Sequence, residues 1–167
     1  ISGKNYEGNE EAMRIIMDHV RTSVFIASDP AGIKPSNTDQ GYILRRLIRR
    51  AIRYARVLDI DIHSNFLEEL ALVVIEEYQS YYHELSQNKN VVLEVLKNEQ
   101  SKFSRTLEKG LKVFEKVAQN SNYIDGETAF HLYDTFGFPI ELTKEEAPLR
   151  NMKVDEDTIK QLIWYVE

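Results

Sequence analysis

The pattern of residues 39–58 constrains the fold of this chain more than any other feature of the sequence. Apolar and basic side chains both recur there at helical spacing, but they fall on opposite sides of the expected helix. The apolar side comprises Leu44, Leu47, Ile48, Ala51, Ala55 and Leu58, and the basic side comprises Arg45, Arg46, Arg49, Arg50, Arg53 and Arg56. The stretch therefore predicts a helix that buries one face and presents a strongly basic opposite face.

Charge is unevenly distributed along the 167 residues. The whole chain carries a formal charge of −6, whereas residues 41–57 contain six arginines and no acid. This stretch therefore contributes +6, and the rest of the chain carries −12. The overall negative charge argues against nucleic acid as a partner, but a basic helix on an acidic body still attracts phosphate. A solvated face, paired in part with neighbouring acids, is the structural alternative.

Helical spacing extends over most of the remaining sequence, and no alternating strand pattern exceeds a few residues. We expect helices over residues 9–27, 39–58, 64–81, 88–119 and 127–136, and shorter ones from about residues 143 and 155. The sequence thus predicts an all-α, predominantly helical fold. This fold is a multi-helix bundle with one long helix and short loop-linked helices at its C-terminal end. Residues 1–8 are expected to be a linker or a frayed end, and residues 9–167 one helical domain.

Several polar residues are expected to cap these helices. The side chains of Asn9 and Ser64 can accept hydrogen bonds from a first helical turn, and Thr143 with Glu146 resembles a capping box. Asp155 is expected to cap a last helix, whose apolar residues are Ile159, Leu162, Ile163 and Val166. Because the chain starts without methionine and ends inside this expected helix, we expect it to be a piece of a longer protein.

Apolar stripes define the expected core of the third and fourth helices. The third helix is expected to bury Phe66, Leu70, Val73, Val74 and Tyr81. The long fourth helix is expected to bury Val92, Val95, Leu96, Phe103, Leu107, Leu111, Phe114 and Ala118. Gly110 is expected to be a mild defect in the fourth helix, destabilising it by about 1 kcal/mol relative to alanine.

The sequence offers no set of residues for catalysis or metal binding. It has no cysteine, which excludes disulfides and thiolate chemistry, and its four histidines are scattered. It also lacks a glycine-rich phosphate loop, an H-x-x-x-H pair and a G-x-S-x-G turn. His19 and His131 lie in expected helices, as packing or hydrogen-bonding groups. No apolar run approaches the roughly 18–20 residues of a membrane span. We expect no catalytic residue, no metal site and no membrane partner.

Four blocks of sequence occur in a characteristic order. They are D-H-V-R at 18–21, P-S-N at 35–37 with G-Y-I-L-R-R-L-I-R-R-A at 41–51, E at 99 with F-S-R-T-L at 103–107 and G at 110, and D-G-E-T-A-F at 125–130 running into L-Y-D-T-F-G-F-P at 132–139. Together these blocks closely resemble the alanyl-tRNA synthetase family, over about residues 10–165. A single arginine-rich helix would be weak evidence, but four ordered blocks are strong.

The resemblance implies a role for the chain within a larger enzyme. It places the chain in the helical middle region that receives the tRNA acceptor stem, after the class II catalytic core and before the editing domain. The parent enzyme couples alanine, ATP with Mg, and alanine tRNA, and it holds zinc in its editing domain. We therefore expect this chain to contain no cofactor, to be inactive alone, to be monomeric and cytoplasmic, and to have as partners alanine tRNA and the catalytic and editing domains of the same parent chain.

The resemblance also implies which residues contact RNA. Asn37 of the P-S-N block and Asp134 of the Y-D-T block correspond to the residues that read a G·U wobble pair in the acceptor stem. The guanine 2-amino group lies in the shallow minor groove, where a carboxylate can accept from it and an amide can both donate and accept. The expected phosphate-binding residues, which set register without reading sequence, are Arg45, Arg46, Arg49, Arg50 and Arg53.

Other interpretations of these residues remain open. A helical scaffold or protein-interaction module with a basic face is the main alternative, and a DNA-binding protein is a third. Asn37 could be a turn residue or cap, and Asp134 a surface acid. The sequence departs from the family at residues 38–40, where T-D-Q replaces the usual Glu-x-Arg and removes one positive charge. It also departs at Pro148, which interrupts a helix that family members tend to continue.

Overall fold

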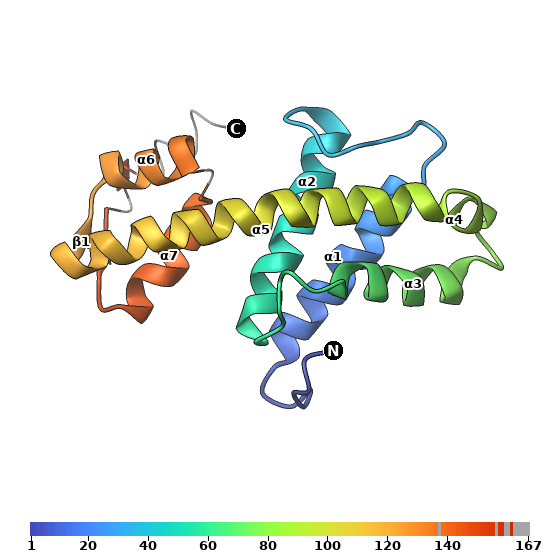
Figure 1. Ribbon diagram of the computed structural model, residues 1–167, viewed down its shortest axis with the longest axis horizontal. Helices are drawn as coiled ribbons and strands as arrows, with labels where there is room; N and C mark the ends of the chain where they lie inside the picture. The colour runs from blue at the N-terminus through green and yellow to red at the C-terminus, as the bar shows by residue number, and fades with distance from the viewer. Residues whose placement is uncertain (137, 156, 159–160, 162–167) are drawn as a thin grey trace. The chain divides into compact units, whose positions relative to one another are not determined.

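The computed structural model describes residues 1–136, 138–155, 157, 158 and 161. In this part of the chain there are seven helices and one two-stranded sheet (Figure 1). The helices are α1 Glu10–Ala27, α2 Asp39–Val57, α3 Phe66–Tyr78, α4 His83–Gln87, α5 Lys89–Asn120, α6 Gly126–Phe136 and α7 Ile140–Leu149, and the strands are β1 Tyr123–Ile124 and β2 Lys153–Val154. The predicted predominantly helical fold is confirmed.

The chain divides into two compact units, residues 1–104 and residues 105–167. We call them the N-terminal unit and the C-terminal unit. The long helix α5 supplies residues to both, because the division falls within its span. The residues that precede α1 have no regular secondary structure, and Lys4 among them forms an ion pair of 2.6 Å with Asp59.

The core of the N-terminal unit forms around α1 and α2, which lie side by side, while α3 packs on α1 (Figure 1). Each of the first two helices presents one apolar stripe to the other. The buried residues of α1 include Ile16, Val20 and Val24, and those of α2 include Leu44, Ile48, Ala51, Ile52 and Ala55. The predicted apolar face of α2 is therefore confirmed, except that Leu47 is only half-buried and Ile52 is buried as well.

Polar side chains of α5 hold the loop that follows α2. The buried Gln100 side chain donates to the carbonyl oxygens of Ile62, at 2.8 Å, and Ser64, at 2.7 Å. Ser104 donates to the Ile62 carbonyl as well, at 3.0 Å. These carbonyls lie outside helices and would otherwise be buried without partners. The loop and α5 are thus joined within the N-terminal unit.

The expected helix over residues 64–81 is wrong in its extent and in part of its buried face. Helix α3 ends at Tyr78, and the separate short helix α4 follows. Val73 is 58% exposed and Tyr81 82%, whereas Leu67 and Ile75 are buried instead. Helix α3 is apolar around much of its circumference, so its spacing is compatible with more than one buried face, and packing on α1 selects one.

Two expected N-terminal caps are also wrong. The Asn9 side chain donates back to the carbonyl oxygen of Asn5, at 3.0 Å, and makes no hydrogen bond to the first turn of α1. Ser64 donates to the carbonyl oxygen of Asp61, at 2.6 Å, while α3 begins at Phe66. Short polar side chains bond equally well to nearby backbone outside a helix, and here that competition decides the outcome.

A small parallel sheet joins distant segments of the C-terminal unit. Strand β1 pairs with β2 in the register Tyr123↔Lys153 and Ile124↔Val154. Helices α6 and α7 lie between the two strands in sequence and contact each other. We did not predict this sheet, because strands of two residues have no measurable period.

Gly110 of α5 allows an aromatic side chain of the C-terminal unit to pack directly against this helix. A Cβ atom at this position would overlap the ring of Phe138, which is fully buried. Phe138 also stacks on Phe114, which belongs to α5 as Gly110 does, with ring centroids 5.8 Å apart. The expectation that Gly110 is only a mild defect is therefore wrong, since the aromatic side chain occupies the space that the glycine leaves.

The segment after α6 contains one wrong and one correct cap prediction. Helix α7 begins at Ile140, so Thr143 lies inside it as a buried residue and is not its N-terminal cap. Pro148 lies in the last turn of α7, which ends one residue later. Asp155 accepts from the backbone N–H of Thr158, at 3.1 Å, as a cap does. The expected apolar residues Ile159, Leu162, Ile163 and Val166 lie outside the described residues.

Candidate nucleic-acid interface

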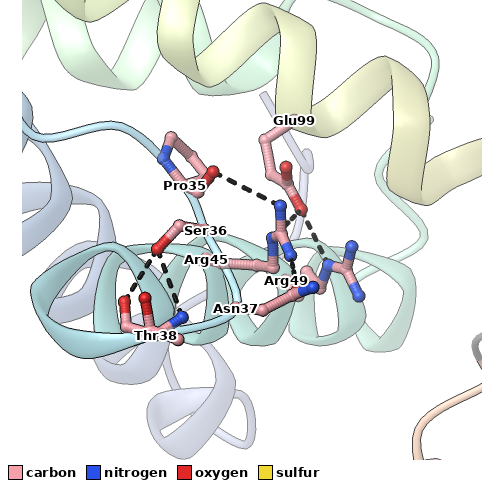
Figure 2. Close-up of polar contacts among 7 residues, drawn as sticks. All are labelled: Pro35, Ser36, Asn37, Thr38, Arg45, Arg49 and Glu99. Carbon is pink, nitrogen blue, oxygen red and sulfur yellow. Dashed lines mark hydrogen bonds and ion pairs between the residues drawn. The ribbon is translucent and has the colours of Figure 1, made fainter.

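The P-S-N block forms a tight loop before α2. The Ser36 hydroxyl donates to the carbonyl oxygen of Thr38, at 2.7 Å (Figure 2). The Ser36 N–H donates to the carbonyl oxygen of Gly41, at 3.0 Å. A Cβ atom on Gly41 would overlap both Ser36 and the carbonyl oxygen of Lys34. Glycine at this position therefore allows the loop to lie directly on the first turn of α2.

The first residue of α2 adopts a left-handed backbone conformation. Asp39 has φ +52°, which few residues other than glycine, asparagine and aspartate accept readily. Asp39 lies two residues after Asn37 and is the middle residue of T-D-Q, the three residues that depart from the family sequence. The turn that places Asn37 therefore depends on an aspartate that tolerates positive φ.

Asn37 is exposed, and its side chain has a defined partner. The guanidinium of Arg45 donates from Nη1 to the Asn37 amide oxygen and from Nη2 to the carbonyl oxygen of Pro35, at 3.3 Å (Figure 2). A guanidinium has donors only, so the amide group facing it must be the oxygen. The amide nitrogen makes no hydrogen bond within the described part of the chain. Asn37 thus keeps its amide nitrogen as an exposed hydrogen-bond donor.

A buried carboxylate, that of Glu99, lies close to the guanidinium group of Arg45 that bonds to Asn37. Glu99 of α5 is 3% exposed and accepts from Nε of Arg49 at 2.7 Å. The same carboxylate oxygen lies 3.6 Å from Nε of Arg45. The guanidinium of Arg49 also lies over the Phe103 ring, 5.0 Å from its centroid. Two arginines of the basic face are therefore turned toward one acid within the N-terminal unit.

The other arginines of the predicted phosphate-binding set are placed differently. Arg46 and Arg50 are exposed, and Arg53 is half-buried. The guanidinium of Arg50 lies 5.7 Å from the centroid of the Tyr54 ring. The basic face thus has an inner pair, Arg45 and Arg49, in ion pairs with Glu99, and an outer pair, Arg46 and Arg50, on the surface.

His19 of α1 is influenced electrostatically by one member of the outer pair, Arg50. Its pKa lies below the ordinary value of 6.5, because burial of the half-buried ring disfavours the charged form and the positive charge of Arg50 adds to that effect. The carboxylate of Asp18 acts in the opposite direction. The expectation that His19 is a packing residue in a helix agrees with its position in α1.

Asp134 lies in the C-terminal unit, on α6, and its side chain is exposed. In the same helix the hydroxyl of Thr135 lies 3.1 Å from Nδ1 of His131, which makes His131 the hydrogen-bonding group that was expected. Asn37 belongs to the other unit. The structure therefore describes each proposed reader in its own surroundings, and their approach to a common base pair stays a prediction.

A pocket of about 260 Å³ lies beside the P-S-N loop. The loop residues Lys34 and Pro35 line one side, and α5 lines the other with Val91, Glu94, Val95, Asn98, Glu99 and Lys102.

The described residues contain no group of three or more histidines, aspartates or glutamates that could hold a metal ion. In the same part of the chain, no helix is long and apolar enough to cross a membrane.

Comparisons with known proteins decide the family. The sequence model of the family described as "tRNA synthetases class II (A)" matches residues 1–164. The chain is 47% identical over 152 residues to the Alanine–tRNA ligase of Borreliella afzelii (strain PKo), which covers 88% of this chain and 25% of that protein. The chain belongs to the alanyl-tRNA synthetase family.

Two other relatives carry the same name. The Alanine–tRNA ligase of Oleidesulfovibrio alaskensis is 41% identical over 165 residues, covering 96% of this chain and 18% of the relative. That of Bacillus pumilus is 42% identical over 165 residues, covering 94% of this chain and 18% of the relative. The chain thus spans only about a fifth to a quarter of the length of these relatives.

Glu99 is the site residue whose role the sequence did not reveal. It belongs to a block that resembles the alanyl-tRNA synthetase family, yet no pattern indicated that it pairs with arginines of α2. Arg49 and Glu99 are 50 positions apart, so no local spacing joins them. The signal that could have found it is the excess charge of the arginine face, which requires a nearby acid when part of that face is buried.

Proposed function

We propose that this chain recognises the acceptor stem of alanine tRNA at its G·U wobble pair and positions the stem for aminoacylation. The observation that carries the proposal is the exposed amide donor of Asn37, held beside a helix with exposed arginines. Family membership supports a part in alanine–tRNA ligation. In this proposal, adenylate formation from alanine and ATP with Mg, and zinc-dependent editing, belong to other domains of the same protein.

The outer pair supplies the affinity in this proposal. Arg46 and Arg50 are exposed on α2, where guanidinium groups can bond phosphate oxygens of the RNA backbone. Such contacts set the register of the stem but do not distinguish base pairs. The body of the chain is acidic, so it repels RNA elsewhere and favours one orientation.

The two exposed readers supply the discrimination. The 2-amino group of guanine has no Watson–Crick partner in a G·U pair, and the carboxylate of Asp134 can accept a hydrogen bond from it in the minor groove. The amide nitrogen of Asn37 can donate to an acceptor on the same groove edge, or to a ribose 2′-hydroxyl. One acceptor and one donor suit the groove edge of a wobble pair.

Titration of the chain with labelled RNA tests the proposal. Alanine tRNA is compared with a tRNA of similar size and another identity, and then with an acceptor stem in which G·C replaces G·U. We expect tighter binding to alanine tRNA and to the G·U stem. Equal, weak binding to all of them would contradict the proposal and favour a scaffold or protein-interaction role. A second assay measures alanine-dependent pyrophosphate exchange, and we expect none from this chain alone.

A further inference from the structure

We propose that Glu99 is a positioning residue for base-pair discrimination, which it controls by holding Arg45 and, through Arg45, the amide of Asn37. This inference rests on the proposed function, because discrimination is assigned there to Asn37. It adds a residue that touches no RNA, on another helix and 62 positions away in the sequence. The three residues are shown together in Figure 2.

The polarity of the Asn37 amide depends on Arg45. A free asparagine can turn its amide by half a rotation and present either the oxygen or the nitrogen. Arg45 removes that choice, because it donates to the oxygen and leaves the nitrogen for the partner. A reader that presented both groups equally would pair with donors and acceptors alike and would discriminate poorly.

Arg45 in turn needs a fixed anchor. Its side chain is long and 26% exposed, and ordering such a side chain costs conformational entropy. Arg45 makes two hydrogen bonds to the P-S-N loop, one to Asn37 and one to the Pro35 carbonyl oxygen. These bonds hold the loop in place only if the Arg45 side chain is itself fixed. Glu99 is the contact outside the loop, and it is buried on α5, a helix that also holds the loop after α2. Glu99 therefore ties the loop to the rigid part of the N-terminal unit.

The charge balance gives this role a distinctive signature. Glu99 places one negative charge between the guanidinium groups of Arg45 and Arg49, so the cluster carries +1. Replacing the carboxylate with a neutral amide would leave two like charges that repel each other and displace Arg45. The same replacement would make the surface more attractive to phosphate. Overall RNA affinity and base-pair discrimination should then change in opposite directions.

The test compares three variants of this chain. Glu99→Gln removes the charge with little change in shape. Glu94→Gln is the matched control, because Glu94 lies on the same helix, lines the same pocket and is exposed. Arg45→Lys keeps the positive charge that faces Glu99 but loses the planar fork that bonds to both Asn37 and Pro35. Melting curves by circular dichroism establish that each variant is folded, and Arg45→Lys carries the test if Glu99→Gln does not fold.

The first readout is the ratio of dissociation constants for G·C and G·U acceptor stems. We expect Glu99→Gln and Arg45→Lys to lower this ratio about fivefold or more, toward one, if one good base contact is lost. Glu99→Gln should bind the G·C stem as tightly as the unmodified chain or more tightly, and Glu94→Gln should keep the ratio. An unchanged ratio in folded Glu99→Gln and Arg45→Lys would overturn the proposal.

The second readout does not depend on RNA. The side-chain amide of Asn37 is observed by NMR as a ¹⁵N–¹H₂ signal, whose heteronuclear NOE reports its order. We expect a high NOE in the unmodified chain and in Glu94→Gln, and a clearly lower one in Glu99→Gln and Arg45→Lys. An unchanged NOE would overturn the positioning role. If the unmodified chain shows no preference for G·U, the proposed function fails, whereas this readout still decides whether Glu99 positions Asn37.

Discussion

Arg49 of α2 donates from Nε to a carboxylate oxygen of Glu99 on α5 over 2.7 Å, although 50 positions separate them in the sequence. The carboxylate is almost fully buried, whereas the arginine side chain is 31% exposed. A face that looks uniformly basic in sequence therefore has arginines with different tasks. The inner pair, Arg45 and Arg49, supports the structure of the N-terminal unit, while the outer pair, Arg46 and Arg50, lies on its surface.

Arg49→Ala should lower the free energy of unfolding by about 2 kcal/mol, because a charge-assisted hydrogen bond to a buried carboxylate is lost. Arg50→Ala is the control, since Arg50 is exposed and its contact with Tyr54 contributes about 1 kcal/mol or less. Urea unfolding of both variants measures the difference. Equal stability of the two variants would show that the ion pair with Glu99 contributes nothing measurable.

Arg50→Ala should reduce the salt dependence of RNA binding. Each phosphate contact contributes about 0.7–0.9 to the slope of log K against log salt concentration, so the slope should fall by that amount. Binding to G·U and G·C stems should weaken alike, because phosphates are the same in both. Titrations at four or five salt concentrations give the slope. A slope that stays the same would remove Arg50 from the phosphate-binding set.

Stability of the chain should decrease in mild acid through His19. The pKa of His19 is lowered in the folded state, so the unfolded state binds the proton more readily. The neutral ring therefore contributes to the free energy of unfolding above about pH 6.5, the pKa of the unfolded state. This contribution is lost as the pH falls through the pKa of the folded state. Arg50→Ala should raise the pKa of His19, because one of the two lowering causes is removed. An NMR titration of the imidazole ring measures it. A pKa that does not rise would show that Arg50 has no influence on the ring.

Asp134→Ala should weaken binding to a G·U stem about 5- to 150-fold, the range for one good base contact of about 1–3 kcal/mol. The loss should largely disappear with a G·C stem, where the guanine amino group is already paired. Glu127→Ala is the control, because it removes another exposed acid from the same helix. The decisive measurement is aminoacylation of both stems by a full-length enzyme carrying each change. Intact discrimination in the Asp134 variant would remove this residue from the reader pair.

Gly110→Ala should destabilise the C-terminal unit despite the higher helix propensity of alanine. The propensity gain is about 1 kcal/mol, but overlap with the Phe138 ring costs about 1–3 kcal/mol. In a Phe138→Leu background the same change should be less harmful, because the ring is gone. Unfolding curves of the single and double variants give the coupling. An equal effect in both backgrounds would show that the ring is not the cause.

The parts of the fold that the sequence predicted share long, regular patterns. Helices α1, α2 and α5 have single apolar stripes over at least 18 residues, and their observed limits lie close to those expected. Helix α4 and the strands β1 and β2 are too short to show a period. The face of α3 could not be chosen from its sequence, because the helix is apolar on several sides and only its contact with α1 selects one.

The sequence proposed the residues of the candidate site but not their arrangement. Motif resemblance indicated Asn37 and Asp134, and helical spacing placed the arginines on one face of α2. The division of the arginines into an inner and an outer pair depends on Glu99. This residue contacts the arginines of α2 only because α5 packs beside them in the folded chain. The conformation of Asp39 depends on the loop that packs on Gly41, and residue type alone does not encode that contact.

The small sheet of the C-terminal unit also closes a long loop of the chain. The backbone N–H of Lys153 donates to the Asn122 carbonyl oxygen at 2.8 Å, and the backbone N–H of Asp155 donates to the Ile124 carbonyl oxygen at 3.0 Å. Both bonds close a loop that contains α6 and α7. Two strands that run in the same direction cannot be joined by a tight turn. Closing the longer loop between them costs conformational entropy, which the hydrogen bonds of the sheet must offset. The two strands therefore pair only across the segment that contains α6 and α7, which a tight turn could not replace. Two residues per strand add little to the final stability, yet they link the two ends of that segment.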